Sequence, residues 1–105
     1  MSTKTDSGAD TTAPSLDTMI VRTPGTIGGK PRIAGTRIGV HRLAGWWKMG
    51  LTEDEIHDRV PSLTMAEIFV GLAYYQLHRE EIEGYLDDEE QAAQSLLKRK
   101  RPTRA

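Results

Sequence analysis

Apolar residues recur at helical spacing from residue 40 onward. The first members of this pattern are Val40, Leu43, Ala44 and Trp47. A following glycine, Gly50, is typical of a helix end. The pattern predicts a helix over residues 40–49 with Trp47 in its core face. Trp46 points about 100° away on such a helix, so it either completes the packing or anchors an interface.

Two Thr-x-x-Glu motifs mark the starts of the next two helices. They are Thr52 to Glu55 and Thr64 to Glu67. In such a motif the hydroxyl accepts from the backbone N–H three residues on, and the carboxylate reaches back to the first N–H. Because Pro61 interrupts the helical pattern, we expect helices over residues 53–59 and 65–79.

The helix predicted over residues 65–79 is apolar around most of its circumference. One arc comprises Met65, Ile68, Phe69, Leu72 and Tyr75, and further apolar residues follow at Ala66, Val70, Ala73 and Leu77. A helix of this kind must be covered on more than one side, which a small domain cannot do alone. We therefore expect a homodimer or a protein partner. The candidate interface residues are Trp46, Val70, Tyr74 and Leu77.

The flanking segments differ from this helical centre. Residues 1–17 are rich in Ser, Thr, Asp, Gly and Ala, which predicts a disordered arm. Short extended pieces punctuated by Gly and Pro predict a small β ribbon within residues 18–39. We expect a core domain over residues 18–80, an acidic helix over residues 81–97 and a basic disordered tail over residues 98–105.

Charge is strongly segregated although the net charge is only −1. Residues 18–52 carry six Lys or Arg and no acid, whereas residues 53–97 carry twelve acids against Arg59 and Arg79. Two surfaces with different partners would produce this distribution. Neutralisation of one half by the other across a dimer is the alternative.

Residues 53–79 have the lengths of a helix-turn-helix, in which the second helix enters the DNA major groove. Before its terminal Arg79 that helix offers only Gln76 as a side chain that reads base edges, and Glu67 lies in its first turn. DNA binding would therefore depend on the basic segment of residues 18–52. Thr64 would add a phosphate contact, because it lies at the start of a helix. The candidate nucleic-acid contacts are Lys30, Arg32, Arg37, Arg42, Lys48 and Thr64.

Three of these contacts have a simpler alternative. Arg37 is equally suited to an ion pair with Asp54 or Asp58, while Lys30 and Arg32 can simply lie exposed on the ribbon.

Other chemistry finds little support in the sequence. Gly29-Lys30 lacks the first glycine and the Ser or Thr of a phosphate loop. The three histidines, His41, His57 and His78, lack metal-ligand spacing, so we expect them on helix surfaces and predict no metal or cofactor. The acids of residues 87–90 suit a solvated or partner-binding face. No nucleophile or acid–base set suggests an enzyme.

The absence of cysteine excludes disulfides, and no apolar run is long enough to cross a membrane. We expect a cytoplasmic location.

The string from Gly29 to Val40, with Gly50-Leu51-Thr52 and Pro61-Ser62-Leu63-Thr64, closely resembles the family called domain of unknown function 433. The resemblance covers residues 18–80. It implies a mainly α, homeodomain-like and winged-helix-related helix-turn-helix bundle with a short N-terminal β segment. It also implies an antitoxin of a type II toxin–antitoxin pair that silences a PIN-like nuclease toxin and binds its own promoter DNA. Gly39 departs from the proline frequent there, which would loosen the start of the first helix.

The sequence leaves three hypotheses about function. The chain is an antitoxin that binds toxin and DNA, or a protein-interaction module without DNA binding. An enzyme is the third, and no set of residues favours it.

Overall fold

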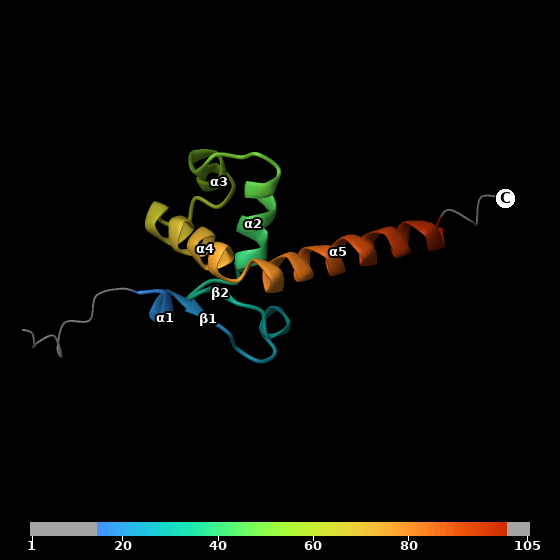
Figure 1. Ribbon diagram of the computed structural model, residues 1–105, viewed down its shortest axis with the longest axis horizontal. Coiled ribbons are helices and arrows are strands. Elements are labelled where there is room, and N and C mark those ends of the chain that lie inside the picture. Colours follow the sequence, from blue (N-terminus) through green and yellow to red (C-terminus); the bar gives the residue numbers. More distant parts are fainter. Residues whose placement is uncertain (1–14, 101–105) are drawn as a thin grey trace, which may run out of the picture.

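The computed structural model describes residues 15–100, with side chains as far as Lys98. Its body consists of α2 (Val40–Lys48), α3 (Glu53–Arg59) and α4 (Met65–Leu77) (Figure 1). A small β ribbon and α1 (Leu16–Met19) lie against the end of the body from which α5 (Arg79–Lys100) projects outward. This is the mainly helical fold with a short N-terminal β segment that the sequence predicts.

The core lies where α2 crosses α4. Its buried hydrophobic residues are Ile20, Ile33, Val40, Leu43, Ala44, Ile56, Leu63, Ile68, Leu72, Tyr75 and Ile82. Gly71 permits the close approach of the two helices, because a Cβ built at this position would lie 2.5 Å from Leu43 Cδ1. Leu43 is fully buried, so it has little room to yield to a larger side chain.

Both predicted capping boxes are present. Thr52 Oγ1 accepts from Glu55 N at 3.2 Å, and Thr64 Oγ1 accepts from Glu67 N at 3.1 Å. Each glutamate in turn accepts from the backbone N–H of its threonine at 2.8 Å. The motifs therefore place the starts of α3 and α4 correctly.

The predicted end of α4 is two residues too late. His78, with φ −130° and ψ 46°, leaves the helical region and terminates α4 at Leu77. The next residue, Arg79, already begins α5. A single non-helical residue thus redirects the chain, which a pattern of apolar spacing does not reveal.

The ribbon pairs β1 (Ile20–Val21) with β2 (Arg32–Ile33) in antiparallel register, with Ile20 opposite Ile33. The loop between them contains a 3₁₀ turn, η1 (Ile27–Gly29). Ile20 and Ile33 are both buried, so the ribbon contributes one apolar face to the core.

The ends of the chain differ from the predicted boundaries. Residues 15–17, assigned to the disordered arm, include the start of α1, and Leu16 packs against the core. α5 continues to Lys100, three residues past the predicted helix end. Residues 1–14 and 101–105, which hold the rest of the predicted arm and tail, lie outside the described residues.

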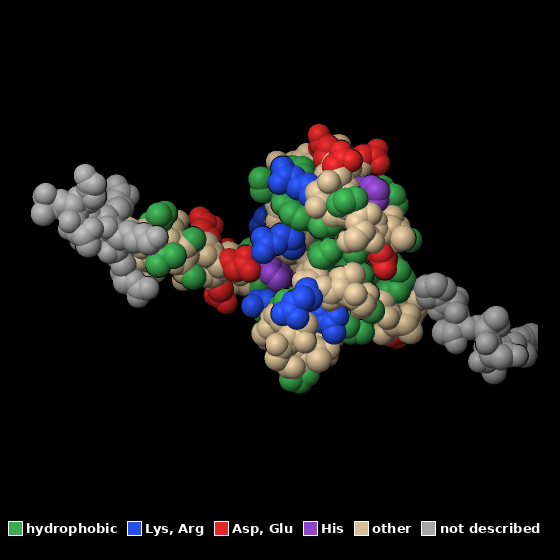
Figure 2. Space-filling model, turned by 180° about the vertical axis from the view of Figure 1, so that it is seen from behind, with side chains coloured by type: hydrophobic (Ala, Val, Ile, Leu, Met, Phe, Trp, Pro, Cys, Tyr) green, Lys and Arg blue, Asp and Glu red, His purple; other side chains and the backbone are tan. Residues whose placement is uncertain are grey.

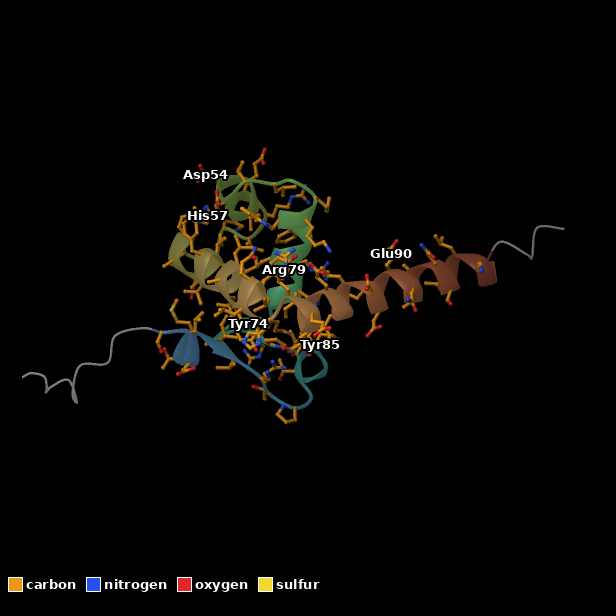
Figure 3. The ribbon with its side chains drawn as sticks, in the orientation of Figure 1. Asp54, His57, Tyr74, Arg79, Tyr85 and Glu90 are labelled. Atoms are coloured by element: carbon orange, nitrogen blue, oxygen red, sulfur yellow. The ribbon has the colours of Figure 1, made fainter. Side chains whose placement is uncertain are left out.

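Arg22 ties the ribbon to two helices. Its Nη1 lies 2.6 Å from Glu81 Oε2 on α5, and its Nη2 donates to Glu81 Oε1 at 2.9 Å and to the Tyr74 hydroxyl on α4 at 2.6 Å. Tyr85 also donates to Glu81 at 2.6 Å, and Figure 3 shows Tyr74 and Tyr85 on the side of the body that faces the ribbon. The hydrogen bonds from Arg22 lower the pKa of the Glu81 carboxyl, which stabilises the charged pair.

Two predicted core residues are instead exposed. Phe69 is 52% exposed, because the inward side of α4 is centred on Ile68, Gly71 and Leu72 rather than on the wider predicted arc. Trp47 is 38% exposed, since it lies in the last turn of α2, where the chain turns away at Gly50.

Candidate functional site

A concave, basic pocket of about 520 Å³ opens at the N-terminus of α2. Figure 2 shows Lys and Arg side chains gathered on this face of the body, near the root of α5. The ribbon loop, the residues before α2, the end of α3 and one residue of α5 form its walls. The lining residues are Ile27, Lys30, Arg37, Ile38, Gly39, His41, Arg42, Trp46, Val60 and Glu89.

Three of the predicted nucleic-acid contacts, Lys30, Arg37 and Arg42, converge on this pocket. Within residues 15–98 none of the three forms an ion pair, so neither Asp54 nor Asp58 binds Arg37 there. Lys30 Nζ lies 5.4 Å from the centre of the Tyr85 ring, which holds the ammonium at the pocket without neutralising it.

The other three predicted contacts lie elsewhere. Arg32 is a structural clasp of the ribbon, donating to Thr36 O at 2.7 Å and Thr23 Oγ1 at 2.9 Å. Lys48 lies 3.6 Å from Glu83 on α5. The hydroxyl of Thr64 is engaged by its own capping box, and that box places the carboxylate of Glu67 where a bound phosphate would sit.

His41 is buried, although its sequence context predicts a position on a helix surface. It is only 6% exposed, and its Nε2 lies 3.0 Å from Glu89 Oε2. Burial lowers the pKa of His41, with smaller contributions from Arg42 and Lys30, and Glu89 opposes the shift. The imidazole is therefore neutral near pH 7 and donates its Nε2–H to Glu89, leaving Nδ1 buried without a partner among the described residues.

Gly39 makes this burial possible. A Cβ built on Gly39 would lie 2.5 Å from His41 Cε1 and 2.6 Å from His41 Nδ1. The glycine therefore creates the space in which the imidazole ring packs.

Of the two tryptophans, Trp46 is the partly buried one. Its ring forms part of the pocket wall, and the guanidinium of Arg59 lies 5.7 Å from the ring centre. Trp46 is thus separate from the other predicted interface residues, which lie on α4.

Among those, Val70 and Tyr74 are partly buried, whereas Leu77 is 67% exposed. Tyr74 stacks on His78 with ring centres 4.3 Å apart and accepts from Arg22. One face of α4 exposes three apolar residues that are spaced four apart, namely Phe69, Ala73 and Leu77. We call them the α4 strip.

The acidic residues lie away from the pocket, apart from Glu89. Asp54 and His57 lie on α3 at the end of the body opposite the ribbon, and Glu90 lies on the projecting part of α5 (Figure 3). Within residues 15–98 no group of three potential ligands is close enough together to hold a metal ion. None of the described helices is long and apolar enough to cross a bilayer.

These features define a small helical domain with a β ribbon, a basic pocket and a projecting helix. The profile of the family described as "Protein of unknown function (DUF433)" matches residues 20–75. The chain belongs to this family.

A solved crystal structure of a DUF433 member from Anabaena variabilis is similar to it, with 32% sequence identity and a TM-score of 0.63. The similarity covers 69% of this chain and 71% of that one. No curated protein matches the chain.

Sequence reasoning missed Gly39, His41 and Glu89 as parts of one site. A glycine directly before the helix could have indicated the site, because its missing side chain leaves space for a neighbouring residue. Glu89 gave no signal, since only the direction of α5 brings it 3.0 Å from a residue far away in the chain.

Proposed function

We propose that the chain is the antitoxin of a type II toxin–antitoxin pair and acts by binding a PIN-like nuclease toxin. The role is a binding role and not a catalytic one. The family resemblance supports the choice of partner, and the distal half of α5 supports the mode of binding.

The distal half of α5 is the observation that carries this proposal. From Asp87 to Lys98 every side chain is exposed, including Leu96 at 48% and Leu97 at 57%. Burial of a leucine side chain is worth about 1.5–3 kcal/mol, so a groove on a partner would gain from covering these two. An extended helix with an apolar end is suited to helix-in-groove recognition.

The α4 strip supports the homodimer that accompanies this role. Phe69, Ala73 and Leu77 carry no charge and lie on one face of α4, away from the pocket. A patch of this kind can contact its own copy about a two-fold axis, which would leave α5 of each copy free for the toxin.

Promoter DNA is a second and separable part of the proposal. α4 is poorly suited to read bases, because Glu67 occupies its first turn and Gln76 is its only amide side chain. A mobility-shift assay on the upstream DNA at two salt concentrations tests this part, since phosphate contacts weaken steeply with salt. Absence of a shift at low salt favours the alternative, an interaction module without DNA binding.

The toxin contact is tested by searching the genes beside this one for a PIN-like nuclease and co-expressing its product with the chain, with growth as the readout. The intact chain should restore growth and co-elute with the nuclease. Leu96→Glu with Leu97→Glu should abolish both effects. Gln91→Glu with Gln94→Glu is the matched control, because it adds the same charge to the same helix and retains both leucines. Equal protection by both pairs, or no growth arrest by the nuclease alone, would contradict the proposal.

A further inference from the structure

The pocket at the start of α2 is lined by more positive than negative side chains within residues 15–98. Lys30, Arg37 and Arg42 hold three positive charges around one concavity without an ion pair in that range. Its one carboxylate, Glu89, accepts from neutral His41. Like charges held together repel each other, so the folded chain keeps this arrangement at a cost that a bound anion would remove.

The backbone adds to the same preference. The N-cap of α2 is Gly39, which offers no side-chain cap, and the first turn carries no acid. By contrast, α3 and α4 each have a threonine cap with a glutamate. The positive end of the α2 dipole therefore lies at the pocket, where Glu89 is the one negative side chain and the Val40 N–H already donates to Pro31 O at 2.9 Å.

A second observation is independent of the helix end. His41 is more than nine-tenths buried in the pocket wall and has an unpartnered Nδ1. In the neutral ring this Nδ1 is an acceptor that solvent does not reach, so it marks a tightly packed wall and makes no contact with an anion. Its burial depends on Gly39, so the wall is built by the packing of specific residues and is not an accidental surface hollow.

The size and shape of the pocket limit which anions can bind in it. A volume of about 520 Å³ is within the range of pockets that enclose small ligands. Duplex DNA presents its phosphates on a convex surface and would reach only the rim. A terminal phosphate carries a second negative charge and can enter, while the Trp46 ring in the wall offers a surface on which a base can stack.

We propose that this pocket binds the terminal phosphate of a nucleotide, either free or at the end of a single nucleic-acid strand. Arg37, Arg42 and Lys30 pair with the phosphate oxygens. Trp46 lies beside the attached nucleoside. This site is separate from the α5 surface and goes beyond the toxin contact.

The test uses the full chain and four probes: inorganic phosphate, AMP, a short 5′-phosphorylated DNA strand and the same strand with a 5′-hydroxyl. Binding is followed by calorimetry and by tryptophan fluorescence. AMP, the phosphorylated strand or both should bind, and the hydroxyl strand should bind at least about tenfold more weakly. Binding of only AMP or of only the strand identifies the source of the phosphate.

Variants locate the site. Arg37→Gln with Arg42→Gln should weaken phosphate binding at least about tenfold, since both residues are exposed and their loss leaves the core intact. Lys48→Gln with Arg79→Gln removes the same charge outside the pocket and should leave the affinity unchanged. The fluorescence response should persist in Trp47→Phe and disappear in Trp46→Phe.

Three results would overturn the proposal. They are no binding of any phosphate probe, equal binding of the phosphorylated and hydroxyl strands, and equal loss of affinity in the two charge-removing pairs. None of these results bears on growth protection by α5, so failure here and failure of the toxin contact are distinguishable.

Discussion

The imidazole of His41 occupies the space into which a Cβ of residue 39 would project, 2.5 Å from Cε1. Gly39 is buried and its φ is −77°, so it is required for space and not for an unusual backbone conformation.

Gly39→Ala should destabilise the domain by about 1–3 kcal/mol, as overpacking of a filled interior does. Urea unfolding measures the loss. Gly39→Ala combined with His41→Ala should regain part of it, because the ring that causes the clash is gone. Failure of the second substitution to relieve the first would show that the clash lies elsewhere.

The two glycines within α4 and α5 should respond to alanine with opposite signs. Gly71→Ala forces a Cβ to 2.5 Å from buried Leu43 Cδ1 and should lower the unfolding free energy by about 1–2 kcal/mol. A Cβ at Gly84 meets nothing within 4 Å, so Gly84→Ala should raise stability by about 0.5–1 kcal/mol through helix propensity. Thermal unfolding of both variants under one condition provides the comparison.

Leu72 and Phe69 separate the core from the exposed face of α4. Leu72→Asp buries a carboxylate and should cost several kcal/mol, which leaves the chain unfolded or insoluble. Phe69→Asp changes a side chain that is 52% exposed and should leave the fold intact while weakening the proposed dimer. Circular dichroism reports the first effect, and sedimentation over a concentration series reports the second.

His41 should make stability depend on pH. Its folded pKa lies below the ordinary value of 6.5, so the unfolded chain takes up the proton first. The stability that the neutral ring contributes is complete above pH 6.5 and is lost as pH falls toward the folded pKa. Glu89→Gln should lower that pKa further, because Glu89 opposes the shift. NMR titration of the ring gives the pKa, and urea midpoints across the same pH range give the stability. A folded pKa above 6.5 would reverse the sign and contradict this interpretation.

Local signals predicted much of the fold because their physics is local. The capping boxes at Thr52 and Thr64 fixed two helix starts through hydrogen bonds that span three residues. The exposure of Phe69 could not be predicted in this way. It depends on how closely α2 approaches Gly71, which is a property of two helices and not of one apolar period.

The same limit applies to the candidate site. Charge segregation indicated a basic surface, and Lys30, Arg37 and Arg42 do line one pocket. Arg32 has the same charge in the same segment, yet its guanidinium is held by Thr23 and Thr36. Only the folded path of the ribbon distinguishes a ligand contact from a structural clasp.

The distal part of α5 has a thermodynamic consequence of its own. Beyond Glu89 every side chain as far as Lys98 is exposed, so this stretch gains no support from packing, and short helices without tertiary support are marginal in water. Local opening of this stretch should therefore cost far less than global unfolding. A protein that captures it in the helical state must supply the ordering free energy, so its affinity would rise or fall with substitutions that alter helicity without touching the interface.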